Sequence, residues 1–287
     1  MRRLAMAAWC LTGALGTAAA SETPAVRITY VANEGFLVSA GSSAVLVDGL
    51  FGGRSLGFAE APMGEALQQL RSAAPPFDRV RVALVTHRHV DHFDPGVAVA
   101  FLTSRPEAVL VGPPQVVERL EATTGFEAVA SRVHATPATP GADRTLEFGD
   151  IEVRALGIPH GPYMVEDPST GQKVNRHRNT ENLGFAVTVG GFTFFHNGDA
   201  YLLDAEEYCR FGLTPPEVDV AFLGGLLWPP VEKGFDTIRR CLTPRHVVPM
   251  HLNPDQKTAA RERLAALKAQ LPPLVIPGAP MAEIVLP

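Results

Sequence analysis

The chain has 287 residues, of which 46% are hydrophobic and 19% charged, so it is long and apolar enough to bury a sizeable core. This composition excludes an intrinsically disordered protein. The formal net charge of −5 and the lack of a basic run exclude bulk attraction to a phosphate backbone, so we expect no nucleic acid partner.

The first 20 residues have the features of a secretory signal peptide. Two arginines near the start precede an apolar stretch over residues 4–15, and an Ala-x-Ala sequence ending at Ala20 follows. The stretch is shorter than the roughly 18 residues that a membrane span requires. We therefore expect export, to the periplasm or beyond, with one mature domain over residues 21–287 and no membrane anchor. A buried N-terminal helix is the alternative.

The first half of the mature chain alternates between strand-like and helix-like segments. Strands are predicted at Val26–Ala32, Gly35–Ala40, Ala44–Leu50, Val80–Val85 and Ala108–Val111, and helices at Pro62–Arg71 and Gln115–Ala122. Asp94 and Pro95 are typical of a helix N-cap and first turn, so a further helix should begin there. The polar residues just before Asp94 therefore lie in a strand-to-helix loop, where rigid elements often hold catalytic groups.

The second half repeats this pattern. Hairpins are predicted at Leu146–Leu156 and Phe185–Phe195, strands at Val218–Leu223 and His246–Met250, and a helix at Pro254–Gln270. Two such halves without a linker predict one α/β domain built as a two-sheet sandwich. The polar segment Gly161–Glu181 lacks periodicity and is longer than an ordinary connection, which is typical of a functional or disordered loop.

Two of the three cysteines belong to the predicted mature protein. Cys10 would leave with the signal peptide, whereas Cys209 and Cys241 would stay. An oxidising compartment permits these two to pair, but their spacing does not show that they meet in space. We expect two separate buried thiols, with a disulfide as the alternative.

The densest chemical signal is a cluster of histidines and one aspartate. His87, His89, Asp91 and His92 fall within six consecutive positions of a chain that has nine histidines. Imidazole and carboxylate bind divalent first-row metals, and alternate side chains of a short turn can face two neighbouring ions. Without metal, so dense a cluster would repel itself when protonated near pH 6. The cluster therefore predicts a metal site rather than a polar surface turn.

This His-x-His-x-Asp-His pattern, in its strand-to-helix setting, resembles the metallo-β-lactamase-fold hydrolases. Further matches follow in order: His160 in Gly-Ile-Pro-His-Gly, Asp199 in Phe-His-Asn-Gly-Asp, and His251 in Val-Pro-Met-His. The Pro-Met-His sequence is most similar to the branch that includes ascorbate-phosphate lactonase-like and phospholipase D-like members. The resemblance spans nearly the whole mature chain and implies a four-layer αββα sandwich.

The resemblance also implies a ligand set for two divalent metal ions. It places His87, His89 and His160 on one ion, Asp91, His92 and His251 on the other, and Asp199 between them. Nitrogen and oxygen ligands suit zinc, which we expect, with iron or manganese as alternatives. The ligand set lacks the cysteine that some β-lactamases use, so we do not expect antibiotic hydrolysis.

Other residues are expected around the ligands. Asp48 resembles the family's aspartate that supports the ligand loop from behind, as carboxylates do for metal-bound imidazoles; a strand-end cap is the alternative. His196 is expected behind the ligands or in the core. Tyr163, His177 and Trp228 are candidates for the substrate pocket, with a solvated surface loop as the alternative for His177.

Such a site predicts a hydrolase. Two ions lower the pKa of a bridging water and polarise a carbonyl or phosphoryl oxygen, and Asp91 could pass a proton to the leaving group. Two divalent ions, two carboxylates and one hydroxide leave a net positive charge, which favours an anionic substrate. We expect an exported dinuclear hydrolase that cleaves a small-molecule ester, lactone, amide or phosphoester. An iron-dependent oxidoreductase and a non-catalytic metal-binding protein are the alternatives.

Overall fold

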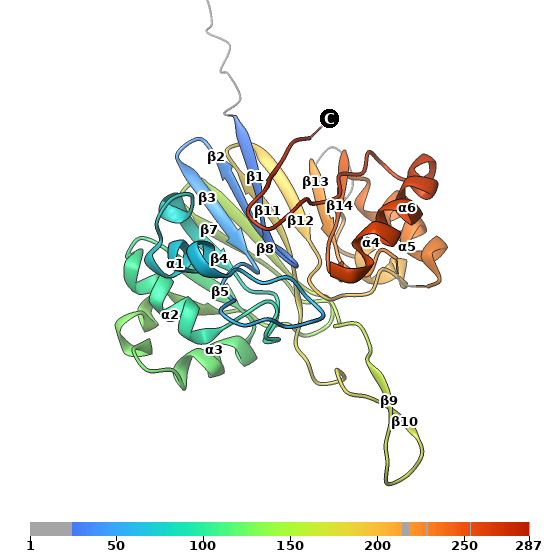
Figure 1. Ribbon diagram of the computed structural model, residues 1–287, viewed down its shortest axis with the longest axis horizontal. Helices are drawn as coiled ribbons and strands as arrows, with labels where there is room; N and C mark the ends of the chain where they lie inside the picture. Colours follow the sequence, from blue (N-terminus) through green and yellow to red (C-terminus); the bar gives the residue numbers. More distant parts are fainter. Residues whose placement is uncertain (1–24, 214–217, 228, 253, 287) are drawn as a thin grey trace, which may run out of the picture.

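The computed structural model describes residues 25–213, 218–227, 229–252 and 254–286 (Figure 1). The predicted signal peptide and the pocket candidate Trp228 lie outside the described residues, so export stays a prediction. Within the described part of the chain, no helix is both long and apolar enough to cross a membrane.

Two β-sheets pack face to face at the centre of the molecule. The first has seven strands: β15 (Glu283–Ile284), β1 (Val26–Ala32), β2 (Gly35–Ala40), β3 (Ser43–Val47), β4 (Val80–Leu84), β5 (Val109–Gly112) and β6 (Val133–Ala135). The second has six: β14 (His246–Pro249), β13 (Val220–Leu223), β12 (Phe192–His196), β11 (Leu183–Val189), β8 (Ile151–Gly157) and β7 (Asp143–Phe148). Side chains from both sheets form one apolar core between them.

Helices cover the outer face of each sheet. The first group is α1 (Gly64–Ser72), α2 (Pro95–Ser104) and α3 (Pro114–Glu121); the second is α4 (Ala205–Cys209), α5 (Val231–Thr237) and α6 (Lys257–Leu267). Figure 1 shows the two groups on opposite sides of the paired sheets. Each group packs on its own sheet through a separate apolar cluster. The architecture confirms the four-layer αββα sandwich expected from the sequence.

The near-continuous apolar strands follow from burial on both faces. In β2, Phe36 and Val38 face the core between the sheets, whereas Leu37 faces the helices. Successive side chains of a strand point to opposite faces, so a strand covered on both sides needs apolar residues at every position. The predicted strands therefore stood out in the sequence, and the structure has them at nearly the predicted bounds.

The parallel strands bring the chemical residues to one edge of the sandwich. β3 and β4 run parallel in the first sheet, and β12, β13 and β14 in the second. Asp48 follows β3, and the histidine cluster follows β4. Asp94 comes two residues after the cluster, and its side chain accepts a hydrogen bond from the Val97 amide at 2.9 Å. This confirms the predicted N-cap of α2. Ligand sites of open α/β sheets commonly lie at such carboxyl ends.

The segment Gly161–Glu181 is not the irregular loop that we expected. It contains two short antiparallel strands, β9 (Met164–Glu166) and β10 (Lys173–Asn175), and Figure 1 shows this hairpin projecting from the body of the molecule. Strands of three residues are too short for a two-residue periodicity to be recognised, and half of their residues are polar. We call this hairpin the β9–β10 arm.

The expectation of two separate thiols is also wrong. Cys209 and Cys241 form a disulfide, and their Cα atoms are 4.5 Å apart. Cys209 ends α4, and Cys241 lies in the π-helical turn Ile238–Leu242 that continues α5. Neither α4 nor α5 was predicted, so the sequence offered no reason to place the cysteines side by side. The bridge joins two helices of the outer layer of the second sheet.

Candidate metal centre

A compact turn presents the histidine cluster. After β4, the amides of His92 and Phe93 both donate to the carbonyl oxygen of His89, at 3.2 and 2.9 Å. The Asp94 amide donates to the Leu50 carbonyl at 2.8 Å and ties the end of the turn to the segment after β3. The turn therefore holds its side chains toward the edge where the two sheets meet.

Four donor atoms form the first group, which we call group 1. The His89 Nδ1 atom lies 3.0 Å from His87 Nε2 and 3.3 Å from His160 Nε2. Asp199 Oδ2 lies 3.3 Å from His160 Nε2 and 3.6 Å from His87 Nε2. Ligands about 2.0–2.1 Å from a tetrahedral zinc ion are about 3.3–3.4 Å from one another. The spacing of group 1 therefore fits a first-row cation.

Four further donor atoms form group 2 beside it. Asp91 Oδ2 lies 3.5 Å from both His92 Nε2 and His251 Nε2. Asp199 Oδ1 lies 3.5 Å from His92 Nε2 and 3.6 Å from His251 Nε2. His92 Nε2 and Asp199 Oδ1 are buried and make no hydrogen bond within the described residues. A cation between these atoms would supply the partner that they lack, so group 2 fits a metal ion as well.

The structure thus brings together all seven ligands expected from the sequence. Asp199 belongs to both groups because its two oxygen atoms face different neighbours. The remaining three donors of each group are those that the resemblance assigned to each ion. Donor atoms of His87, His89, His160 and Asp199 lie close enough together to hold an ion, and so do those of His92, His251, Asp199 and Glu34. Glu34 is therefore a further candidate donor beside Asp91.

Contacts behind the ligands orient the imidazole rings. His92 Nδ1 donates to Asp48 Oδ2 at 2.8 Å, and the Thr86 hydroxyl donates to the same oxygen at 2.5 Å. The Thr86 hydroxyl in turn accepts from His87 Nδ1 at 3.0 Å. Because Nδ1 carries the proton in both rings, the lone pair of Nε2 is left to face a cation. Asp48 lies where the sequence placed it, while Thr86 was not foreseen.

The two groups differ in how readily they hold protons. Burial lowers the pKa of His87 well below its usual value and that of His89 to about 4. Burial alone would also lower the pKa of His251, but the Asp199 and Asp91 carboxylates raise it to about 10. Burial likewise opposes a proton on His92, but the Asp91 carboxylate and other nearby carboxylates raise its pKa. Without a cation, the His87 and His89 imidazoles of group 1 are neutral, whereas His92 and His251 of group 2 hold protons.

Two residues of the turn between β1 and β2 complete the surroundings and were missed. The Asn33 amide donates to Asp91 Oδ2 at 3.1 Å and so orients that carboxylate. Glu34 is fully buried, and neither of its oxygens forms a hydrogen bond within the described residues. Its Oε2 lies 3.7 Å from His92 Nδ1. An Asn-Glu-Gly sequence is typical of a surface turn, so it carried no sign of burial beside a metal centre.

Glu34 is a buried carboxyl group that the sequence-based count of charges at the site did not include. Burial and the nearby Asp199 carboxylate raise the pKa of Glu34 well above its usual value. A Cβ atom at position 224 would come within 2.7 Å of Glu34 Oε1, so Gly224 leaves the space for this side chain. His196 is a core residue that donates to the Glu34 backbone carbonyl at 2.9 Å. With Asp48, the site has four carboxyl groups instead of the two that were counted.

A cavity of about 640 Å³ opens onto both groups. The His177 ring centroid lies 4.7 Å from that of His89 and 4.4 Å from that of His160. The Tyr163 ring lies 5.4 Å from His177 at the base of the β9–β10 arm. Both pocket candidates within the described residues therefore line this cavity. Further residues that were not foreseen also line it, among them Phe58, Arg88, Val90, Arg119 and Tyr201.

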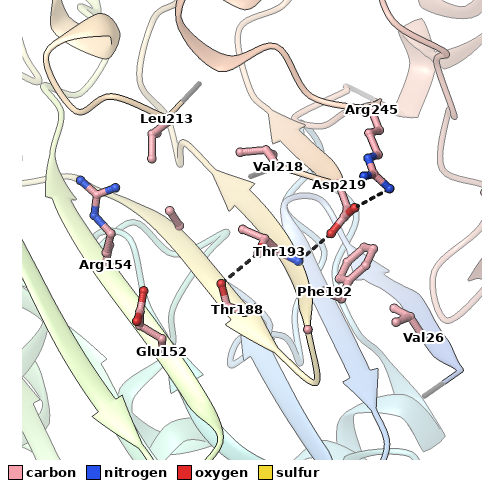
Figure 2. A pocket seen from close by; sticks show the side chains of 12 residues that line it. Val26, Glu152, Arg154, Thr188, Phe192, Thr193, Leu213, Val218, Asp219 and Arg245 are labelled. Carbon is pink, nitrogen blue, oxygen red and sulfur yellow. Dashed lines mark hydrogen bonds and ion pairs between the residues drawn. The ribbon is translucent and has the colours of Figure 1, made fainter. Parts of the chain in front are cut away.

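A second cavity, of about 540 Å³, lies at the amino ends of β12, β13 and β14, away from both groups. Figure 2 shows Thr188, Thr193, Asp219 and Arg245 joined to one another by hydrogen bonds and an ion pair. Asp219 accepts from the Thr193 amide at 2.8 Å and lies 3.4 Å from the Arg245 guanidinium. The described residues that line it include no histidine or cysteine. The cavity offers no counterpart of the metal centre.

Comparison with known proteins agrees with this description. Residues 44–272 match the family model described as Beta-lactamase superfamily domain. A UPF0173 metal-dependent hydrolase from Polaromonas sp. is 30% identical over 204 residues, which cover 66% of this chain and 67% of that protein. A UPF0173 metal-dependent hydrolase from Pyrococcus furiosus is 24% identical over 236 residues, which cover 79% of this chain and 85% of the relative.

Solved structures share the fold. A possible metal-dependent hydrolase from Veillonella parvula has a TM-score of 0.61 and 16% sequence identity, and the match covers 91% of this chain and 99% of that one. CmlA, a diiron β-hydroxylase from Streptomyces venezuelae, has a TM-score of 0.55 and 17% identity, with 91% of this chain and 54% of that one covered. At these identities the likeness concerns the fold alone.

Proposed function

Because this chain belongs to the β-lactamase superfamily and is a metal-dependent hydrolase of that superfamily, we propose that it uses two metal ions to hydrolyse a small-molecule ester, lactone, amide or phosphoester. When bound, two divalent ions supply an activated water nucleophile and a Lewis acid that polarises the scissile carbonyl or phosphoryl group. The chain's own residues hold the ions, orient one another and handle protons.

The division of Asp199 between the two groups is the observation that carries the dinuclear proposal. A carboxylate that served a single ion would need only one of its oxygens there, and the other would be free to bind elsewhere. Here Oδ2 faces His87 and His160, while Oδ1 faces His92 and His251. Each oxygen completes a set of four donors at spacings suited to one cation.

Asp91 is the group that we propose moves a proton. It is almost fully buried but lines the cavity, so its carboxylate belongs to group 2 and also borders the space for a substrate. Burial opposes its ionisation, but the positive charge of His92 and hydrogen bonds from His251 and His92 hold its pKa below the usual range. Asn33 fixes its orientation. An ionised, oriented carboxylate can accept the proton of the nucleophile and pass it to the leaving group.

Zinc is the metal that we propose, because three of the donors of group 1 are imidazoles and the fourth is a carboxylate. Group 2 has two imidazoles and two carboxylates, and the Glu34 carboxyl group lies close to its His92, His251 and Asp199 donors. Oxygen-rich sets also suit manganese and iron. The oxygen-rich donors of group 2 therefore favour a second candidate function, an iron-dependent oxidoreductase. An assay for iron in the purified protein distinguishes this function from that of a zinc hydrolase.

We further propose that the enzyme acts outside the cytoplasm, without a membrane anchor or a nucleic acid partner. The signal-like first 20 residues support export. The disulfide between Cys209 and Cys241 supports it independently, because structural disulfides persist in oxidising compartments. Cell fractionation, with a free-thiol assay on the isolated protein, tests both points; a cytoplasmic protein with two free thiols would contradict the proposal.

Metal analysis joined to an activity screen tests the main proposal. The mature protein should contain two ions per chain and hydrolyse a member of a panel of lactones, aryl esters, phosphodiesters and β-lactams. A chelator should abolish turnover, and added metal should restore it. His89→Ala should remove one ion and abolish turnover while the circular dichroism spectrum stays unchanged. Turnover that persists in the variant at the wild-type rate would show that the ligand assignment is wrong.

A further inference from the structure

Two arginines line the cavity above the metal centre. Arg88 lies between His87 and His89 in the turn after β4 that carries the histidine cluster, which we call the ligand turn. The backbone of that turn therefore determines its place. Arg119 reaches over from α3 and donates to the Arg88 carbonyl at 3.0 Å. The ion pairs of arginine and lysine among the described residues include neither Arg88 nor Arg119, and Arg88 is only partly exposed. The pair is therefore a concentration of positive charge beside the cavity.

The carboxylates of the cavity do not neutralise this charge. Among the described lining residues, the acidic side chains are Asp91 and Asp199, and both are expected metal ligands. Once two cations are bound, these carboxylates are already balanced. Arg88 and Arg119 then favour an anionic group that lies away from the bond being cleaved, since arginine binds carboxylate and phosphate through paired hydrogen bonds.

Apolar side chains line the same cavity and are unusually exposed. Phe58 and Tyr163 are 48% and 54% accessible to solvent, and Val90, in the ligand turn, is also exposed. The three come from separate segments: the stretch between β3 and α1, the base of the β9–β10 arm, and the ligand turn. Exposed apolar surface that gathers at a cavity from separate segments commonly marks a binding site.

From these two features we infer that the substrate is an amphiphilic anion. It has a hydrolysable bond, an apolar segment that packs on Phe58, Val90 and Tyr163, and a separate carboxylate or phosphate group bound by Arg88 and Arg119. This inference rests on the proposed function, because it concerns the substrate of the same site. A cavity of about 640 Å³ lies within the usual range for small-molecule sites.

A matched series of substrates tests the inference. The series consists of nitrophenyl esters with a six-carbon acyl chain that ends in a methyl, a carboxylate, a phosphonate or a trimethylammonium group. The wild-type enzyme should have kcat/KM at least about tenfold higher for an anionic ester than for the neutral one, and lowest for the cationic one. The carboxylate and phosphonate members distinguish the two kinds of anion.

Variants of Arg88 test whether this residue causes the preference for anionic esters. Arg88→Ala should lower the ratio of kcat/KM between the anionic and neutral esters about tenfold, mainly through KM, and Arg88→Glu should reverse the order of anionic and cationic esters. Arg81→Ala is the matched control, because Arg81 is exposed on β4, does not line the cavity and changes the net charge equally. It should leave the ratio as in the wild type. Metal content is measured for every variant.

A binding measurement without turnover separates the inference from the proposed function. Calorimetry on chelator-treated protein should show hexylphosphonate binding about tenfold tighter than methylphosphonate, and weaker binding in Arg88→Ala. Ester hydrolysis without charge preference, together with binding that ignores Arg88, would overturn the inference and leave the function standing. Failure of every ester, with binding that depends on Arg88, would overturn the function alone. Failure of both measurements would overturn both.

Discussion

The two donor groups of the metal centre share Asp199 but lie in different electrostatic surroundings. Group 1 has three imidazoles, and burial keeps His87 and His89 neutral. In group 2, carboxylates raise the pKa of His92 and bring that of His251 to about 10, and Glu34 lies behind them. Two adjacent sites with similar donor atoms can therefore differ in the pH range over which they bind a metal ion. In group 1, His87 and His89 can bind a cation without losing a proton. In group 2, His92 and His251 must release protons before they can bind one.

Removing the residue that the groups share should have the largest effect. Asp199→Asn keeps the size of the side chain but removes its charge and one of its two oxygen acceptors. We expect metal content to fall from two ions per chain to less than one, and turnover to fall more than about 100-fold, since losing mere supports of ligands already costs about 10–100-fold. Elemental analysis after dialysis and an ester assay measure the two effects.

A matched control exists at the other end of the strands. Asp219→Asn changes an aspartate that accepts a backbone amide hydrogen bond beside the second cavity. It should leave metal content and turnover unchanged. Two tightly held ions in Asp199→Asn would show that this carboxylate does not join the groups.

The next largest effect should come from Asp48, which supports one imidazole in each group. It accepts directly from His92 and, through the Thr86 hydroxyl, orients His87. Asp48→Asn should weaken metal affinity about 10–100-fold in both groups. Asp48 accepts from the Thr86 amide on Oδ1 and from the Thr86 hydroxyl and His92 on Oδ2, and asparagine has only one acceptor oxygen for these two positions. Competition with a fluorescent chelator measures this affinity. A loss confined to group 2 would mean that Thr86 holds His87 without Asp48.

The pH dependence of metal binding should distinguish the groups. Because His251 in group 2 has a pKa of about 10 without metal, a cation there must displace a proton at pH 7.5, and falling pH strengthens the competition from protons. His89 in group 1 has a pKa of about 4, so its imidazole stays neutral down to pH 5.5. We therefore expect one ion to dissociate between pH 7.5 and pH 5.5 while the other stays bound.

Calorimetric titrations in buffers of different ionisation enthalpy measure the protons released by each ion. The ion that is lost first on acidification should be the one whose binding releases more protons. His251→Ala should remove that ion selectively. Equal proton release for both ions would contradict the difference between the groups.

The smallest expected effect concerns Glu34 in the metal-free protein. Its pKa is raised in the folded state, so this group favours folding below its unfolded value of about 4.5 and opposes folding as pH rises above it. Glu34→Gln should therefore raise the melting temperature at pH 7.5 by about 2–4 °C and lose this advantage near pH 4. Differential scanning fluorimetry at several pH values measures it. A variant less stable than the wild type at pH 7.5 would show that the charge of Glu34 is needed.

Local patterns accounted for most of the elements and for the ligand types. The His87–His92 cluster, the Asp94 N-cap and the hairpins depend on residues close in the chain, so spacing alone reveals them. The β9–β10 arm was missed because its strands are too short to show a period. The disulfide was missed because its cysteines are 32 positions apart on helices that were not predicted.

By itself, the sequence determined which donor atoms are available and that the first four lie in one turn, because imidazole and carboxylate chemistry and chain spacing are local properties. Only the tertiary structure decided that Asp199 turns one oxygen to each group and that Glu34 is buried behind His92. Both facts depend on how two sheets pack against each other. That packing sets distances between residues more than fifty positions apart, which no local pattern records.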